Sequence, residues 1–416
     1  MLTILPGKMD SRPVIICEAL LMKSSGSPGM TDVLIVGAGP AGSHLAYLLA
    51  EQGLQVTIID KQAFPRVKVC GGGLSRKAMD LLGFDLGPAM HQAIGGAILN
   101  YRNRDAIIKE IEPMAACTVV RSEFDKLLLD RACAKGARFL AETAFIDATE
   151  SADAVSVVTS QGTLRCSLLL AADGAASTVR NKLFGKDLVA YVPALEAMVW
   201  PAEGALERFG ARALFDFDGM PRGYGWIFPK RDHFNVGVYS PFGGAALRQH
   251  LDRFTAAYAS LQQPLRVEYQ GYIIPLKNRR NVFQCGRVWL LGDAAGLAEA
   301  LFGEGIYFAL KSATIAARAI AADGVGASGV ASGLYSRLLR RELLPELRAA
   351  AWMARLIYRF PKLAFSHLVL NQHINHDFAG LISGQMGYRH CLFKTAVGFP
   401  RWLLPSKAPD SGGNRI

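Results

Sequence analysis

The apolar positions of the chain change their period several times, and each period predicts a different element. The unbroken apolar run over 33–36 and the segment 56–59 predict strands buried on both faces of a parallel sheet. Between them, apolar residues at 45, 46, 48 and 49 follow the spacing of a helix. The chain therefore opens with a predicted βαβ unit.

Shorter elements are predicted after this unit. Strict alternation over 97–112 predicts one strand, and 122–135 is expected to be a helix capped by Ser122. Ser75 is expected to cap a short helix that ends at Leu82. Further short strands are predicted over 144–148, 154–160 and 168–171.

The second half of the chain begins with a different pattern. Residues 191–275 alternate and are rich in aromatics, which predicts an antiparallel sheet with one helix near 245–261. A buried strand over 288–291 and a long helix to about residue 322 then return to the nucleotide fold. The segment 335–404 is expected to be helical and is unusually apolar for the end of a chain.

These elements predict an α/β protein with an inserted antiparallel sheet and a helical C-terminal segment. We expect a discontinuous nucleotide-binding domain, a substrate-binding sheet domain and an apolar, basic helical segment. Their ranges are 30–190 with 276–325, including part of the substrate sheet near 95–115, then 191–275, and 330–416. Residues 1–29 lack the pattern of a cleaved signal peptide, and we expect a disordered tail there or a misplaced start codon, with Met30 just before the first strand.

Composition and charge narrow the partners. The 416 residues carry 46 Lys and Arg against 35 Asp and Glu, a net charge of +11. The basic residues are scattered without a run of five, so a nucleic-acid-binding arm is not expected. Six arginines between 337 and 359 do lie beside apolar sequence. They predict either peripheral contact with a lipid surface or simply a solvated helix face.

Cysteine usage points to a reducing compartment. The seven cysteines are odd in number, widely spaced and contain no C-x-x-C pair, which favours free thiols over a disulfide frame or a metal site. No apolar run reaches the 18 or so residues that a membrane-spanning helix needs. We therefore expect a cytoplasmic protein, peripheral at most to the inner face of a membrane.

The strand-to-helix turn of the opening unit carries a nucleotide fingerprint. Gly37-x-Gly39-x-x-Gly42, with Pro40 and Ala41 inside it, follows a strand and opens a helix. Such glycines allow a tight turn, close approach to a pyrophosphate and close helix–strand packing. Asp60, with Lys61 beside it, ends the second strand about 20 residues on, where a carboxylate accepts from a ribose hydroxyl.

Five further landmarks follow the fingerprint. Cys70-Gly71-Gly72-Gly73 cannot form a stable helix or strand, which predicts a loop held by other residues. Arg121 stands before a predicted helix and suits phosphate, and Asp173-Gly174 follows a predicted strand. Gly292-Asp293 ends the late buried strand, and the loop Gly303-Glu304-Gly305-Ile306 opens the long helix.

In this order, the landmarks resemble the FAD-binding fold of the p-hydroxybenzoate hydroxylase type. Within that fold the chain is most similar to the geranylgeranyl reductase family. Three stretches carry the resemblance, namely 68–75 (KVCGGGLS), 224–230 (YGWIFPK) with Gly237 after it, and 292–306 with its GDAAG and GEGI segments. The resemblance covers residue 31 to about 322, and the last 90 or so residues match only in general character.

The resemblance implies FAD as cofactor and a Rossmann-type FAD-binding domain. In it, Asp293 would accept from a ribityl hydroxyl, and the backbone of Gly303 to Ile306 would approach the isoalloxazine. The helix that follows would direct its positive end at the flavin. Arg121 would hold FAD phosphate or ribose, or is alternatively a surface arginine at a helix start.

Cys70 and the aromatic strand are the candidate catalytic residues. Cys70 would position substrate or relay a proton beside the flavin, whereas most lone cysteines are buried hydrophobes. Tyr224, Trp226 and Phe228 alternate and so share one strand face, as a wall for an alkyl chain or as ordinary core aromatics.

The activity implied is reduction of isoprenoid C=C bonds by hydride from reduced FAD, with a nicotinamide cofactor (NADPH) or ferredoxin as electron donor. The substrate would be a hydrophobic isoprenoid. Two alternatives stay open, namely a monooxygenase or halogenase on the same fold and a flavoprotein that passes electrons to a quinone. Trp226 and Pro229 partly fit a halogenase pattern, but Tyr224 and Phe228 depart from it. Ala300 stands where the family often has proline, which leaves the rigidity of the 303–306 loop open.

Overall fold

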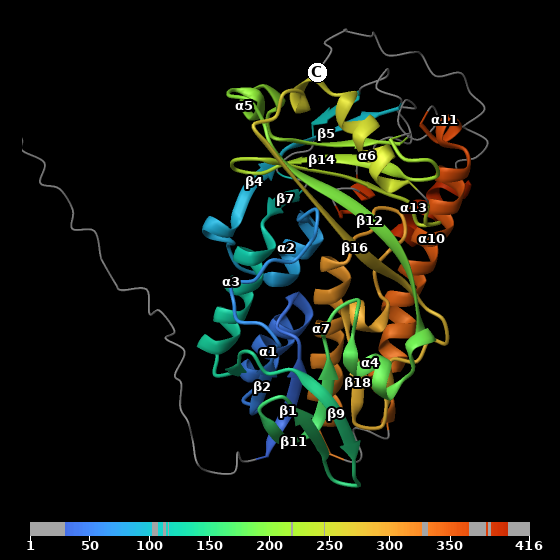
Figure 1. The fold of residues 1–416 in the computed structure, drawn as a ribbon. Helices are drawn as coiled ribbons and strands as arrows, with labels where there is room; N and C mark the ends of the chain where they lie inside the picture. The colour runs from blue at the N-terminus through green and yellow to red at the C-terminus, as the bar shows by residue number, and fades with distance from the viewer. Residues whose placement is uncertain are drawn as a thin grey trace, which may run out of the picture.

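The fold is taken from a computed structural model that describes residues 30–101, 107–110, 114, 116–217, 219–244, 246–326, 332–365, 380–381 and 384–397. The predicted tail 1–29 lies outside these ranges. Two large sheets form the body of the molecule, and in Figure 1 one lies below the other. A helical layer of C-terminal residues covers one side of both.

The lower sheet contains the parallel core that the opening pattern predicts. Strands β2 (Val56–Ile59), β1 (Thr31–Val36), β11 (Gly162–Ala171) and β18 (Val288–Leu290) lie side by side and run parallel. β8 (Arg138–Leu140) extends this core beyond β2, and β17 (Gln284–Cys285) closes the other edge. β9 (Phe145–Glu150) and β10 (Val155–Thr159) form an antiparallel extension on β11. The core strands are almost wholly buried, as their unbroken apolar runs require.

Three long helices cover this sheet. α1 (Pro40–Glu51) packs against both α7 (Ile306–Asp323) and α3 (Arg121–Ala134). α3 begins at Arg121 rather than after it, and the predicted cap by Ser122 is wrong. Val120 is the N-cap and its carbonyl accepts from the amides of the first turn, so no side chain caps this helix.

The upper sheet is antiparallel except for one pair of strands. Its order is β16 (Arg266–Asn278), β12 (Val189–Trp200), β15 (Phe234–Tyr239), β14 (Tyr224–Pro229), β13 (Arg212–Asp216), β5 (Gly96–Asn100) and β6 (Ile107–Glu110). β5 and β6 pair antiparallel, so the prediction of a single strand over 97–112 is wrong. A hairpin and one long strand give the same alternation, and the pattern does not distinguish them.

A small sheet of β3 (Gly73–Ser75), β7 (Ala116–Val119) and β4 (Met90–Ile94) joins the two large ones. Gly73 pairs with Thr118, so the glycine run is partly strand, contrary to expectation. α2 (Arg76–Leu82) starts after Ser75 as predicted. However, the Ser75 hydroxyl does not cap it and donates to Glu304 Oε1 instead.

The remaining helices lie at the edges. The upper sheet carries α5 (Ala205–Phe209) and α6 (Leu247–Ala256), and α4 (Thr178–Leu183) follows β11. Short 3-10 turns occupy 87–89, 186–188, 259–261 and 292–295. The C-terminal layer consists of α9 (Leu334–Leu338), a π-helical turn (Leu339–Leu343), α10 (Leu344–Arg359), α11 (Pro361–Ala364) and α13 (Tyr388–Val397). No helix in the described ranges is long and apolar enough to cross a bilayer.

Candidate active site

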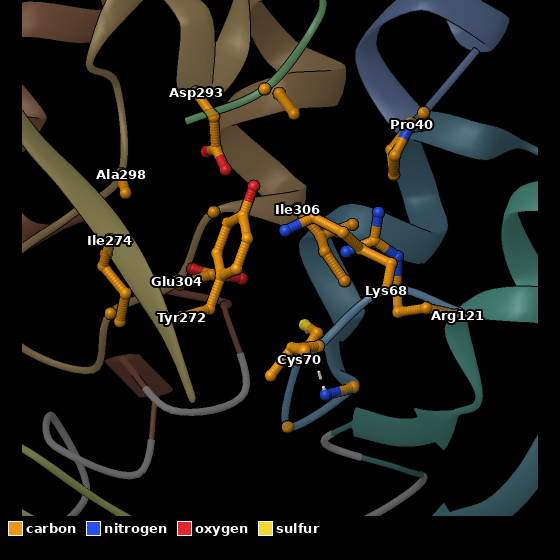
Figure 2. Close-up of a pocket in the computed structure, with 18 of the residues that line it drawn as sticks. Pro40, Lys68, Cys70, Arg121, Tyr272, Ile274, Asp293, Ala298, Glu304 and Ile306 are labelled. Carbon is orange, nitrogen blue, oxygen red and sulfur yellow. Dashed lines mark hydrogen bonds between the residues drawn. The ribbon is translucent and has the colours of Figure 1, made fainter. Parts of the chain in front are cut away.

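A cavity of about 610 Å³ lies between the two large sheets and draws its walls from both. Nearly all of the predicted site residues line it, as Figure 2 shows for several of them. They are Gly37, Gly39, Pro40, Ala41, Asp60, Lys61, Cys70, Gly71, Gly72, Arg121, Asp173, Gly174, Tyr224, Trp226, Phe228, Asp293, Gly303, Gly305 and Ile306. Gly42 and Gly292 do not line it. A Cβ on Gly42 would lie 1.9 Å from the Gly37 carbonyl oxygen, so this glycine serves packing.

One end of the cavity is built from the fingerprint turn. Gly37 has φ +102° and a Cβ there would lie 2.4 Å from the Ala172 carbonyl oxygen, so only glycine fits. The Asp60 carboxylate accepts from the Ala38 amide at 2.9 Å and thereby ties β2 to the turn. Asp60 thus braces the loop, and its place in the cavity wall also leaves it near any ribose bound there.

Two arginines share one buried carboxylate beside this turn. Arg121 forms a bidentate pair with Asp125, at 2.7 and 2.8 Å, and Arg66 Nη2 lies 3.2 Å from the same carboxylate. Arg66 Nη1 is buried and makes no hydrogen bond, and the arginine lies within 3.5 Å of where a Gly39 Cβ would be. A buried guanidinium N–H without an acceptor, beside a glycine-rich helix start, fits a phosphate group. The residues present therefore fit the diphosphate of FAD.

Asp293 and Asp173 occupy the next part of the wall. A Cβ on Gly305 would lie 3.2 Å from Asp293 Oδ1, so this carboxylate faces the N-terminus of α7. Burial raises the pKa of Asp293, and the charges of Lys68 and Arg121 oppose that rise. The Asp173 carboxylate instead accepts from Ser177 and from the amides of Thr178 and Val179, which caps α4.

Lys68 is a site residue that sequence reasoning missed. Its ammonium lies 3.0 Å from the centre of the Tyr272 ring, and both residues line the cavity (Figure 2). Burial lowers the pKa of Lys68 to about 8, and the nearby Arg121 charge adds to this effect. The spacing to Cys70 was the available signal, because residues two apart in an extended segment point the same way.

Two buried charged residues hold the cysteine–glycine loop. The Lys230 ammonium donates to the carbonyls of Gly71 at 2.8 Å, Gly72 at 3.3 Å and Val119 at 3.0 Å. Burial lowers the pKa of Lys230 to about 8. Glu196 accepts from the Cys70 amide at 3.1 Å. Sequence reasoning expected other residues to hold this loop but did not name these two.

The Cys70 thiol faces the cavity beside a cation. The Gly72 amide donates to Cys70 Sγ at 3.4 Å, and the Arg121 guanidinium lies near this sulfur. Arg121 is thus near both the predicted phosphate end and the candidate catalytic residue. A cation and an amide donor therefore lie beside the sulfur of the candidate proton relay.

The aromatic wall has the geometry that alternation predicts. Tyr224, Trp226 and Phe228 share one face of β14, with neighbouring ring centres 5.8 and 6.3 Å apart. Gly237 lies under this wall on β15, where a Cβ would come within 2.1 Å of the Trp226 ring. Trp226 Nε1 donates to Asn235 at 2.8 Å, which fixes the ring.

The loop before α7 is held by side chains from three parts of the chain. Tyr239, Tyr358 and Tyr224 donate to the successive carbonyls of residues 300, 301 and 302. The buried Glu299 carboxylate accepts from the amides of residues 301, 302 and 304 at 2.6 to 3.0 Å. These bonds hold the loop without the proline that Ala300 replaces. Burial raises the pKa of Glu299 to about 7.

Comparisons with known proteins agree with this geometry. The sequence model of the FAD binding domain matches residues 30–187. An uncharacterised protein of Methanosarcina barkeri is 32% identical over 356 residues, which is 80% of this chain and 86% of that protein. A digeranylgeranylglycerophospholipid reductase of Methanosphaera stadtmanae is 27% identical, over 74% of this chain and 80% of its own.

This chain belongs to the geranylgeranyl reductase family.

It is accordingly an FAD-dependent oxidoreductase, and the predicted fold class is confirmed. The crystal structure of a geranylgeranyl bacteriochlorophyll reductase-like protein from Thermoplasma acidophilum has a TM-score of 0.69. The two proteins are 21% identical, and the match covers 90% of this chain and 98% of that one. At this identity the likeness bears on the fold alone. A menaquinone reductase of Mycolicibacterium smegmatis is 29% identical, over 71% of this chain and 77% of that protein. The relatives of this chain are thus named for different hydrophobic molecules, a geranylgeranyl phospholipid and menaquinone.

Proposed function

We propose that this protein is an FAD-dependent reductase that saturates isolated C=C bonds in the polyprenyl chain of a lipid. One observation carries the proposal. The nucleotide-binding end, the aromatic wall and Cys70 all line the same cavity. A polyprenyl chain laid along Tyr224, Trp226 and Phe228 would therefore meet a flavin bound from the fingerprint turn.

FAD, when bound, supplies a hydride to one carbon of the double bond. The other carbon needs a proton, and Cys70 is our candidate for the group that provides it, directly or through a water molecule. The Cys70 sulfur lies near Arg121, so a positive charge faces the group from which the proton would leave. The hydride and the proton together add one hydrogen to each carbon of the double bond. The reaction therefore consumes no oxygen and releases no leaving group.

The protein's own part is to exclude water and to hold the alkene. An isolated alkene offers no carbonyl to polarise, so positioning and a dry cavity carry most of the rate. The Tyr224 and Tyr239 rings line the cavity and are almost wholly buried, and their hydroxyls are bonded to the loop before α7. Their hydroxyls are thus turned to the loop, and the wall offers the chain an apolar surface.

The electron donor and the setting complete the proposal. NADPH or reduced ferredoxin would return electrons to FAD between turnovers. The substrate is a hydrophobic isoprenoid, in line with relatives named for a geranylgeranyl phospholipid and for menaquinone. We place the protein in the cytoplasm, in peripheral contact with the inner face of the membrane where such lipids reside.

A substrate panel tests the proposal. The purified protein is reduced anaerobically and incubated with geranylgeranyl diphosphate, a geranylgeranyl phospholipid and a menaquinone. The proposal predicts that one of these gains two hydrogens per reduced bond by mass spectrometry. Oxygen uptake coupled to substrate would instead identify a monooxygenase or halogenase. Oxidation of the flavin by quinone with an unchanged side chain would identify an electron carrier.

A further inference from the structure

The outer face of α10 and α11 exposes large apolar side chains in a regular row. Trp352, Leu356, Phe360 and Leu363 are 64, 51, 50 and 54% exposed. The first three are four residues apart, so they fall on one stripe of the helix. Phe393 on α13, which packs against α10, is 67% exposed as well. Together these five residues form what we call the C-terminal apolar face.

Basic side chains accompany the apolar ones along α10 and α11. The segment 347–365 holds Arg348, Arg355, Arg359 and Lys362 but no Asp or Glu. All four basic residues are exposed. Arg355 lies 5.7 Å from the Trp352 ring centre and Arg359 lies 5.6 Å from that of Phe360. Apolar aromatics interleaved with arginine are the composition of a helix that lies in the surface of an anionic membrane.

The opposite face of the same helix reaches the loop before α7, which borders the cavity. Met353, Ile357 and Tyr358 are buried, and the Tyr358 hydroxyl donates to the carbonyl of Leu301 in the loop before α7. Tyr388, on α13, lines the cavity itself. α10 and α11 lie at the edge of the molecule in Figure 1, with α13 beside them. A lipid surface on the outer face would thus lie one helix away from the cavity wall.

We infer that the C-terminal apolar face docks onto an anionic lipid surface. The exposed aromatics enter the interface between head groups and acyl chains, and the four basic residues bind lipid phosphates. A second copy of the chain fits this face less well, because a two-fold contact would set arginines against arginines with no carboxylate between them. The inference deepens the proposed function, because it names the surface on which the protein would meet a lipid substrate. Only that biological role rests on the proposed function; the docking itself does not.

Vesicle sedimentation tests the inference without any turnover. The FAD-loaded full chain is mixed with vesicles of phosphatidylcholine alone or with about a third of phosphatidylglycerol. We expect binding to the anionic vesicles only, weakened by salt. The variant Trp352→Ser/Leu356→Ser/Phe360→Ser and the variant Arg355→Glu/Arg359→Glu should each lose binding by about twentyfold or more. The control Ile146→Ser/Val158→Ser/Leu265→Ser removes three exposed apolar residues elsewhere and should bind like the original protein.

Three results would overturn the inference. In the first, the original protein stays in the supernatant with anionic vesicles. In the second, the control loses as much binding as the α10 variants. Alternatively, light scattering shows that the α10 variants change a dimer into a monomer, which assigns the face to a second copy. Flavin content and melting temperature show that each variant is folded. Activity on detergent-dispersed substrate should be unchanged in the α10 variants. If neither the original protein nor any variant shows this activity, the proposed function is refuted but the docking is not.

Discussion

The hydroxyl of Tyr224 donates a hydrogen bond of 2.6 Å to the carbonyl of Phe302. Tyr224 belongs to the aromatic wall on β14, and Phe302 belongs to the loop that leads into α7. This bond joins the surface proposed for the alkyl chain to the loop proposed for the flavin. If the proposed sites are right, this bond helps the protein to set the distance between substrate and cofactor.

Tyr224→Phe should loosen this joint while keeping the ring. The Phe302 carbonyl loses the Tyr224 donor in a partly buried place, which costs about 1–3 kcal/mol. We expect the free energy of unfolding in urea to fall by that amount. Tyr47→Phe is the control, because its hydroxyl donates to Glu51 on an exposed helix face. Equal losses in the free energy of unfolding would show that the Tyr224 bond stabilises the fold no more than an exposed hydrogen bond does.

Cys70→Ala should separate chemistry from cofactor binding. Loss of a general acid lowers turnover by about a hundredfold or more. FAD absorbance and stoichiometry should stay unchanged, since the Cys70 contacts to Glu196 run through its backbone amide. Cys285→Ala, an exposed cysteine in β17, should keep full activity. If Cys70→Ala turns over at the original rate, the thiol is not the proton source.

Glu299 should make stability depend on pH. Burial raises the pKa of Glu299 from 4.5 to about 7, so the folded chain binds a proton that the unfolded chain has released. Stability should therefore fall as pH rises from about 4.5 to 7, by up to about 3 kcal/mol. Thermal melts of the cofactor-free protein across this range measure the slope.

Glu299→Gln is the matched variant for this slope. It is expected to be less stable overall, because its amide group faces a backbone N–H that the carboxylate accepted. Its pH dependence between 4.5 and 7 should nevertheless be flatter than that of the original protein. Parallel curves for both proteins would rule out Glu299 as the titrating group.

Lys68→Met should have opposite effects on stability and on FAD affinity. The ammonium is largely buried, its pKa is lowered to about 8, and it forms no ion pair with any carboxylate of the described residues. Removing it should raise the stability of the cofactor-free protein by about 1–3 kcal/mol. FAD should bind about tenfold more weakly, because the cavity loses a cation facing an anionic cofactor.

Titration with FAD and urea unfolding of the cofactor-free protein measure these two effects. Lys186→Met removes an exposed lysine and should change neither quantity. Unchanged FAD affinity in Lys68→Met would show that this ammonium does not contact the cofactor.

The parallel core could be predicted because its information is local. The apolar run 33–36, the glycines after it and the helix spacing of α1 are read within about 20 residues. The aromatic face of β14 was likewise predictable, since alternation fixes which side chains share a face. Both rest on period and spacing alone.

The contacts that hold the site have no such local signal. Lys230 and Gly71 are 159 residues apart, and Tyr358 and Leu301 are 57 apart. A buried lysine or tyrosine looks like any other in the sequence until the fold shows which carbonyl it faces. The hairpin of β5 and β6 was missed for a related reason, because alternating apolar and polar residues do not show which strand pairs with which.

A single-turnover measurement tests the central claim most directly. The FAD-loaded protein is reduced by one equivalent of dithionite without oxygen and mixed with one equivalent of a polyprenyl substrate. Flavin absorbance and the mass of the extracted lipid are followed together. The proposed function predicts that each flavin reoxidised corresponds to one double bond that gains two hydrogens. Reoxidation with an unchanged polyprenyl chain, or no reoxidation with any prenyl lipid, would contradict it.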